Sequence, residues 1–204
     1  MNIRFHKHDL PAGYLAGEAV AIDTETMGLN PGRDRLCVVQ LSKGDGSADI
    51  VQITTESPRP ENLLALMADV QVLKLFHYAR FDMGILYKSF GIMPQQVYCT
   101  KIASRLVRTY TDRHGLKDLA RELLGVDLSK QQQSSDWGAE SLSEAQLSYA
   151  ASDVLYLHEL KSRLDVMLER EGRFALARSC FEFLSTRVLL DLAGWPETDI
   201  FAHS

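Results

Sequence analysis

The sequence is poor in cysteine and contains no long apolar run. Cys37, Cys99 and Cys180 are the three cysteines among 204 residues, and their wide separation matches no zinc site, redox motif or secreted disulfide framework. We therefore expect reduced cysteines in the core. No stretch approaches the roughly 20 apolar residues of a membrane span, and the N-terminal residues lack the apolar centre of a signal peptide. These absences predict a cytoplasmic protein.

Basic residues are also scarce relative to acidic ones. The chain has 22 Lys and Arg against 27 Asp and Glu, a formal net charge of −5. Proteins that clamp long nucleic acids through counterion release need a basic surface, so this balance argues against that mode of binding. A polyanionic substrate would have to be held locally, by metal ions or by a few placed Lys and Arg. With 46% hydrophobic residues, residues 1–204 are expected to form a single domain.

The order of apolar patterns predicts an α/β fold with a mixed central sheet, flanking helices and a helical C-terminal half. Apolar and β-branched runs predict strands at 18–25, 35–42, 47–53 and 72–76, of which the first three should form an antiparallel meander. Helical spacing predicts helices at 61–69, 80–90, 101–108, 116–124, 143–171 and 174–192. Residues 1–17 are interpreted as an initial strand or arm, and Ser141 with Glu144 as a capping box.

The strand predicted at 18–25 ends in two acids, Asp23 and Glu25. Side chains two positions apart on a strand share a face and lie roughly 7 Å apart along the chain, so both carboxylates can converge beyond the sheet edge. Thr24 points the other way. Turn-forming residues follow and leave the pair open to solvent on one side. Taken alone, such a pair is also typical of a solvated strand end.

Two more acids, Asp82 and Asp153, could join this pair in a single site. Asp82 falls in the first turn of a predicted helix, where the helix dipole favours an acid and is by itself a sufficient explanation. Asp153 shares one face of a predicted helix with Tyr149 and three leucines. A charge in line with a leucine stripe must be paired with a basic residue or bind metal. Both alternatives remain open for Asp153.

Together, the four acids form a ligand set suited to two divalent cations, Mg²⁺ or Mn²⁺, which prefer carboxylate oxygens. No cluster of His or Cys in the sequence competes for that role. In a two-metal site, with ions about 4 Å apart, the cations activate a water and stabilise the leaving oxygen of a phosphodiester. Tyr149 beside Asp153 could orient that water or take its proton. The residues therefore indicate phosphodiester hydrolysis.

Three motifs in order carry a family resemblance. They are D-x-E at Asp23–Glu25, H-x-A-x-F-D at His77–Asp82 and Y-x-x-x-D at Tyr149–Asp153. They resemble the exonuclease motifs of the DEDD superfamily in its tyrosine branch, which includes ribonuclease D. The stretch 116–157 also looks like ribonuclease D over its whole length. The resemblance reaches from residue 18 to about 165, most of the chain.

The resemblance implies an RNase H-like exonuclease fold with two metal ions and 3′-to-5′ removal of nucleotides from a free end. It assigns the four carboxylates to the metals and Tyr149 to the nucleophilic water. These five positions are the catalytic residues that it implies: Asp23, Glu25, Asp82, Tyr149 and Asp153.

The same resemblance suggests four substrate contacts. Leu29 would wedge between terminal bases, the backbone near Met27 would hold the terminal sugar, and His77 and Phe81 would contact the scissile phosphate and the base. Two of these residues have equally plausible structural roles. Leu29 could fold back on the core, and His77 could be a core histidine at a strand end.

About forty residues follow the longest predicted helix, too few for the helical RNA-binding domains of ribonuclease D. In this respect the chain looks most like the nano-RNase C group, which finishes very short oligoribonucleotides and forms homo-octamers. The resemblance therefore implies dinucleotides or short single-stranded RNA as substrates, and a homo-oligomer. The helix predicted at 174–192 carries more apolar residues than one stripe requires, so it could bury a subunit interface or cap the core.

Two other functions remain open from the sequence. One is a general 3′-5′ exonuclease that trims DNA or structured RNA, and the other is a non-catalytic oligonucleotide-binding protein. A dinucleotide specialist would need basic residues for a 5′-phosphate, since Arg suits bidentate phosphate contact. The candidates are Arg105, Arg108, Arg113 and His114, each of which taken singly is more typical of a solvated basic helix face, and Lys130 in the polar loop before the third motif.

Overall fold

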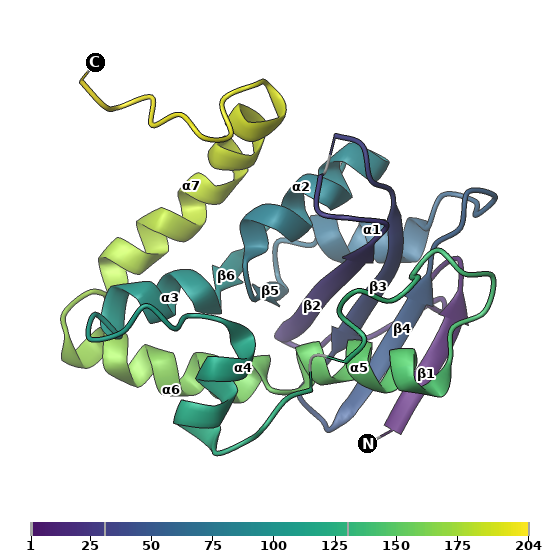
Figure 1. Cartoon of the computed structure of the whole chain (residues 1–204), viewed down its shortest axis with the longest axis horizontal. Coiled ribbons are helices and arrows are strands. Elements are labelled where there is room, and N and C mark those ends of the chain that lie inside the picture. The colour runs from purple at the N-terminus through teal and green to yellow at the C-terminus, as the bar shows by residue number, and fades with distance from the viewer. Residues whose placement is uncertain (1, 31, 130, 204) are drawn as a thin grey trace.

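One mixed sheet forms the centre of the molecule (Figure 1). The computed structural model describes residues 2–30, 32–129 and 131–203, and within them the sheet has six strands. In spatial order the strands are β1 (Asn2–Lys7), β4 (Ser47–Gln52), β3 (Leu36–Ser42), β2 (Ala19–Thr26), β5 (Leu73–Phe76) and β6 (Val97–Cys99). The predicted meander is confirmed, because β2, β3 and β4 pair antiparallel. Strand β1 pairs parallel with β4, β5 with β2, and β6 with β5.

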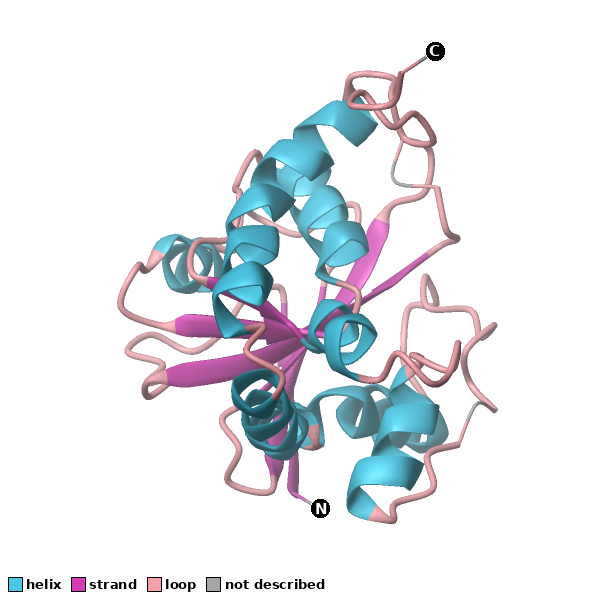
Figure 2. Ribbon diagram, turned by 90° about the vertical axis from the view of Figure 1, so that its left-hand side faces the viewer, coloured by secondary structure: helices cyan, strands magenta, loops and turns pink. Residues whose placement is uncertain are grey.

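Helices cover both faces of the sheet, as Figure 2 shows. They are α1 (Glu61–Ala68), α2 (Ala79–Phe90), α3 (Thr100–Val107), α4 (Leu116–Leu119) with a π-helical turn at Ala120–Leu124, α5 (Glu144–Leu155), α6 (Leu157–Arg170) and α7 (Phe174–Leu192). Buried side chains of α1 and α2 form one apolar layer with the sheet, those of α3, α5 and α6 form the other, and α7 contributes to both. The mixed α/β architecture with a helical C-terminal half is therefore confirmed.

The alternation of side chains along β2 decides which face each functional residue meets. Val20 and Ile22 belong to the apolar layer of α1 and α2, whereas Ala21 belongs to the layer of α5. By the same period of two, Asp23 follows Ala21 toward α5 and Thr24 follows Ile22 toward α2. The two faces therefore receive different parts of the site.

Three expectations about local structure are wrong. Strand β6 was not predicted, because three residues are too short to show a period. The helix predicted at 143–171 is interrupted at Tyr156, which has φ −102° and ψ −3° and separates α5 from α6. The capping box uses Ser143 and Gln146 instead of Ser141 and Glu144, since α5 begins one residue after Ser143.

The cysteines are free, as expected, although only two of them are buried. Cys37 and Cys99 lie in the core and Cys180 is partly exposed on α7. Among the described residues, no helix is both long and apolar enough to span a membrane.

Candidate active site

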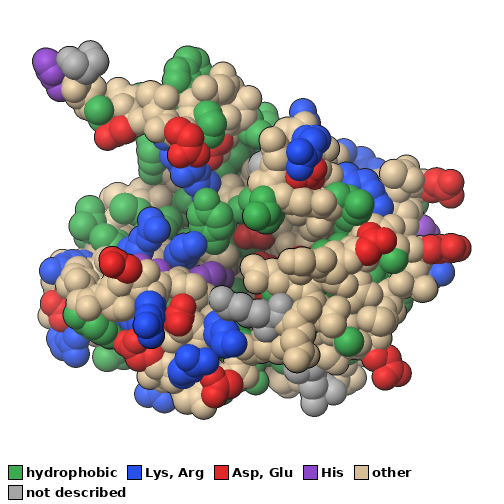
Figure 3. Space-filling view, in the orientation of Figure 1, with side chains coloured by type: hydrophobic (Ala, Val, Ile, Leu, Met, Phe, Trp, Pro, Cys, Tyr) green, Lys and Arg blue, Asp and Glu red, His purple; other side chains and the backbone are tan. Residues whose placement is uncertain are grey.

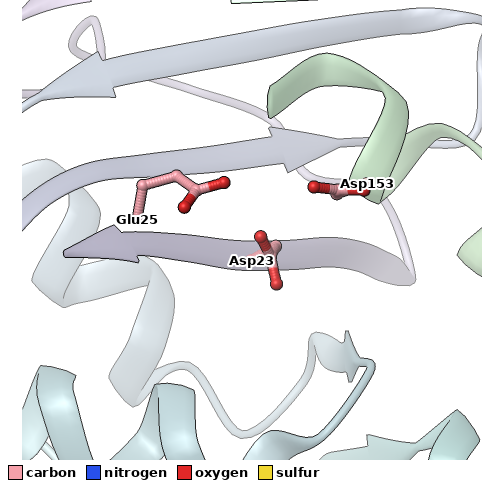
Figure 4. A group of neighbouring side chains, drawn as sticks. All are labelled: Asp23, Glu25 and Asp153. Carbon is pink, nitrogen blue, oxygen red and sulfur yellow. The ribbon is translucent and has the colours of Figure 1, made fainter. Parts of the chain in front are cut away.

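Strand β2 and helix α5 bring three carboxylates together. Asp23 and Glu25 extend from the same face of β2, and Asp153 reaches them from α5 (Figure 4). One carboxylate oxygen of each residue lies within 4.8 Å of the others, a separation that allows one cation to contact all three. The predicted convergence of acids about 130 positions apart in the sequence is therefore present.

Asp82 approaches the cluster from the opposite face of the sheet. It lies in the first turn of α2 and is buried, and its Oδ1 accepts a hydrogen bond of 2.7 Å from Thr24 Oγ1. Thr24 points away from Asp23 and Glu25, as predicted, so its hydroxyl is available to α2. Asp82 is thus held beside the other three acids by the neutral Thr24 hydroxyl, which lies on β2 between Asp23 and Glu25.

Burial and mutual repulsion make ionisation of these acids unfavourable. Burial raises the pKa of Glu25 to about 9, with further contributions from the charges of Asp153 and Asp82. Burial also raises the pKa of Asp82 and of Asp153 to about 7, although hydrogen bonds from Thr24 and Tyr149 respectively oppose these shifts. The pKa of Asp23 is raised well above its usual value by burial and by the three other carboxylates. Nearby positive charge would reverse these shifts.

This donor set fits a divalent cation. Carboxylate oxygens from β2 and α5 converge at this point. Among the described residues, no Lys or Arg forms an ion pair with these three acids. Hard cations such as Mg²⁺ and Mn²⁺ prefer oxygen ligands, and no imidazole or thiolate is part of the cluster. The chemistry of the cluster therefore favours Mg²⁺ or Mn²⁺ over Zn²⁺.

Tyr149 lies one helical turn before Asp153 on α5 and lines the same cavity. Its ring packs at a tilt against buried Trp137, with 6.0 Å between ring centroids. Burial raises the pKa of the Tyr149 hydroxyl, and the charges of Asp153, Glu25 and Asp23 raise it further. The phenol therefore stays protonated while the acids are uncompensated, and bound cations would oppose this effect.

The acids line a cavity of about 320 Å³. Figure 3 shows a hollow near the centre of this face, with acidic side chains at its bottom and Lys and Arg along one side. Leu29, His77 and Phe81 also line the cavity, and the Leu29 side chain is 87% exposed, so it does not fold back on the core. Met27 is not part of the cavity wall, and its amide donates to the Arg35 carbonyl within the β2–β3 pair. The sugar contact expected near Met27 stays a prediction.

His77 combines both of its expected roles. It lines the cavity, yet its ring Nδ1 lies 2.9 Å from Thr100 Oγ1 in the interior. Burial lowers the pKa of His77 to about 3, and the charge of Lys101 lowers it further. The imidazole is therefore neutral at physiological pH and cannot act as a cationic phosphate clamp.

Within the described part of the chain, two lysines that are not among the predicted phosphate ligands supply positive charge at the cavity. Lys101 and Lys117 both line it, and Lys101 Nζ lies 4.3 Å from the centroid of the Tyr78 ring. Burial lowers the pKa of Lys101, and the charge of Arg105 lowers it further. An anion between the two lysines would be favoured by both.

The predicted phosphate ligands mostly have other partners. The Arg108 side chain is buried and forms an ion pair with Glu122, and the His114 ring lies 2.9 Å from Ser104 Oγ. Arg105 lines a neighbouring cavity, and Arg113 is exposed and does not line the acidic one. Lys130 lies outside the described residues.

Sequence reasoning also missed Gln40. It lies on β3 directly opposite Asp23, and its Nε2 donates a hydrogen bond of 2.7 Å to Asp23 Oδ2. A single polar residue inside the apolar run LCVVQLS was the available signal, since a buried amide needs a polar partner. For Lys101 and Lys117 the sequence offered no such signal, because lysines on helices are ordinarily solvated.

Comparison with known proteins identifies related nucleases. A family model described as 3′-5′ exonuclease matches residues 6–169. Ribonuclease D of Gluconacetobacter diazotrophicus is 37% identical over 168 residues, which cover 81% of this chain and 42% of the relative. DNA polymerase I of Aquifex aeolicus is 39% identical over 147 residues, covering 72% and 24% respectively. The chain thus spans less than half the length of these curated relatives.

Solved structures extend the similarity over the whole chain. NrnC of Brucella melitensis is 62% identical, with a TM-score of 0.95 and 100% coverage of both chains. The same protein has been solved with bound Mg²⁺ and bound to pGG, at 60% and 61% identity. RNase D of Escherichia coli, described as an exoribonuclease involved in structured RNA processing, is 27% identical with a TM-score of 0.76, covering 85% of this chain and 45% of that one.

Proposed function

The chain belongs to the 3′-5′ exonuclease family whose model matches residues 6–169, and on that basis we propose that it removes 5′-mononucleotides from the 3′ ends of short oligoribonucleotides. The observation that carries the proposal is the convergence of Asp23, Glu25 and Asp153 within 4.8 Å, with Asp82 beside them. Three acids that line one cavity, with buried Asp82 next to them, repel a phosphodiester unless cations neutralise them, so a role in hydrolysis accounts for them better than binding alone.

We propose that the four carboxylates hold two divalent cations, Mg²⁺ or Mn²⁺. When bound, such cations supply charge stabilisation for the attacking and leaving oxygens of a phosphodiester. Tyr149 Oη, one turn from Asp153, is placed to orient the attacking water and accept its hydrogen bond. The relative from Brucella melitensis has been solved with Mg²⁺, which supports the choice of metal.

The cavity walls favour a nucleotide end with one short extension. Leu29 and Phe81 offer apolar and aromatic contact to a terminal base. Lys101 and Lys117 supply positive charge at the same cavity for a phosphate. The related NrnC of Brucella melitensis has been solved bound to pGG, which supports dinucleotides as substrates.

The test compares labelled substrates at equal concentration in Mn²⁺: RNA and DNA, each of two and of 20 nucleotides, and a structured RNA. We expect turnover of a 5′-phosphorylated RNA dinucleotide to exceed that of a 20-nucleotide RNA and of DNA of either length, with mononucleotides as products. Faster removal of nucleotides from DNA or structured RNA would instead establish the general trimming exonuclease. Binding that survives EDTA, with no cleavage in Mn²⁺, would establish a non-catalytic binding protein.

Asp23→Asn tests the assignment of the acids. Because the amide cannot supply the anionic ligand, we expect hydrolysis to be abolished while the circular dichroism spectrum remains that of the native protein. A folded Asp23→Asn variant with undiminished activity would contradict the assignment.

We also propose that the protein self-associates through α7. Apolar side chains on this helix remain substantially exposed, including Leu176 at 54% and Leu189 at 46%, and such surfaces commonly mark interfaces. Family resemblance suggests an octamer. Light scattering coupled to size exclusion measures the mass, and a monomer at micromolar concentration would refute the proposal.

A further inference from the structure

Gln40 is an uncharged residue built into the wall of the acidic cluster. Gln40 is 0% exposed and is paired with Asp23 across the β2–β3 ladder. Its Nε2 lies 2.7 Å from Asp23 Oδ2. Directly paired residues on antiparallel strands extend from the same face. The backbone register therefore aims the Gln40 amide at Asp23.

The orientation of the amide follows from its surroundings. Gln40 Oε1 is buried and has no hydrogen-bond partner among the described residues. In the ionised state that binds a cation, the Asp23 carboxylate offers only acceptor oxygens, so turning the amide over would place two acceptors against each other. The Nε2 donor therefore faces the ionised Asp23 carboxylate.

We propose that Gln40 is a positioning residue for cation binding: its Nε2 fixes the Asp23 carboxylate in the orientation that contacts the cation. Because Asp23 is a cation ligand only if the proposed function holds, this role rests on that function. A neutral amide suits the task. Lys or Arg at this position would also hold the carboxylate, but its positive charge would repel a divalent ion. Gln40 restrains Asp23 and leaves its negative charge available.

Gln40→Met tests the role, because Met has a similar length and no donor. We expect the dissociation constant for Mn²⁺, measured by calorimetric titration of the substrate-free protein, to rise about 10- to 100-fold, the range found when a hydrogen bond to a metal ligand is removed. The Mn²⁺ concentration for half-maximal hydrolysis should rise by a similar factor. The kcat at saturating Mn²⁺ should recover most of its native value, because the ligands themselves remain.

Gln52→Met is the matched control. Gln52 is also buried, on the neighbouring strand β4, but its Nε2 donates to the Ala139 carbonyl, 2.9 Å away, and not to a cluster acid. The control should bind Mn²⁺ as the native protein does. If Gln40→Met proves unfolded by circular dichroism, Gln40→Asn retains an amide but withdraws it from Asp23 by one methylene, and the same rise is expected.

The outcomes separate the two levels of the proposal. Native Mn²⁺ affinity in a folded Gln40 variant, or an equal loss in Gln52→Met, would refute the positioning role while leaving the nuclease assignment intact. A native protein that neither binds Mn²⁺ nor cleaves RNA would refute the proposed function itself. A selective loss of Mn²⁺ affinity in the Gln40 variant would support the positioning role.

Discussion

Asp153→Asn should stabilise the protein when divalent cations are absent. Three carboxylates have oxygens within 4.8 Å of one another, and two unit charges about 5 Å apart repel by about 3 kcal/mol at an effective dielectric constant of 20. Proton binding relieves part of this repulsion, because the pKa of Asp153 is raised to about 7 and that of Glu25 to about 9, by burial first and, for Glu25, by neighbouring charge. We therefore expect a gain of about 1 to 3 kcal/mol in the free energy of unfolding near pH 7.5.

The pH dependence has a definite sign. Carboxyl groups with a raised pKa in the folded state bind protons there at a pH where the unfolded chain has already lost them. Stability in EDTA should therefore fall as pH rises from about 4, the unfolded pKa, through the folded values of about 7 for Asp153 and about 9 for Glu25. Asp153→Asn removes one of these carboxyl groups and the repulsion it causes. The free energy of unfolding of the variant should therefore fall less steeply than that of the native protein over this pH range.

Urea unfolding followed by circular dichroism measures these differences. At pH 7.5 in EDTA, Asp153→Asn should unfold at higher urea than the native protein. In Mg²⁺ at 100 times its dissociation constant, the native protein should gain about 2.7 kcal/mol from each bound ion, and the variant should gain much less. Asp112→Asn, at an exposed position outside the cavity, is the control for an Asp-to-Asn exchange and should behave as native.

One result would contradict this prediction: Asp153→Asn is less stable than the native protein in EDTA and gains the same stability from Mg²⁺. Such a result would mean that Asp153 is stabilised by contacts within the fold and does not share a cation with Asp23 and Glu25.

Three further predictions concern residues around and away from the cluster. Tyr149→Phe should lower kcat by about 100-fold or more while leaving the Mn²⁺ dissociation constant unchanged in calorimetry, and a change in affinity alone would exclude a role in orienting water. Thr24→Val removes the donor to buried Asp82 and should raise the Mn²⁺ dissociation constant about 10-fold, whereas unchanged affinity would show that Asp82 needs no support. Burial alone would raise the pKa of Asp49, but hydrogen bonds from Arg4, His6 and Tyr14 lower it to about 2. Asp49→Asn should therefore lower the free energy of unfolding by about 1 to 2 kcal/mol at pH 7, after allowance for the 37% exposure of the Arg4 side chain. Urea unfolding should show this gap closing as pH falls from about 4 to about 2, and a gap independent of pH would contradict it.

The sequence predicted the fold where apolar periods were long. Strands β2, β3, β4 and β5 and helices α1, α2, α3 and α7 lie within about two residues of their predicted bounds. Residues 1–17 could be predicted only as an initial strand or arm, because the pairing of β1 with β4 depends on contacts about 45 residues apart that no local pattern contains. The break at Tyr156 was missed because buried apolar residues continue at helical spacing on both sides of it, alanine and valine before and leucine after.

The charged residues of the site could be predicted from the sequence, whereas its neutral hydrogen-bond donors could not. Asp23, Glu25 and Asp153 could be predicted, because charges beside apolar runs need compensation wherever they lie. The donors Thr24 and Gln40 could not be assigned, since a neutral polar side chain satisfies its hydrogen bonds in many ways. Their roles follow from the face of the sheet and the register, which only the assembled structure supplies.

The arrangement explains how one strand can serve two groups of acids. Strand β2 presents Asp23 and Glu25 to one face and Thr24 to the other, so Asp153 from α5 and Asp82 from α2 approach from opposite sides. Acids on one crowded face would repel more strongly and would leave no room for donors. With the sheet between them, Gln40 contacts Asp23 on the α5 side while Thr24 contacts Asp82 on the α2 side. The two donors therefore restrain carboxylates of the cluster without adding positive charge, and the negative potential that attracts divalent cations is preserved.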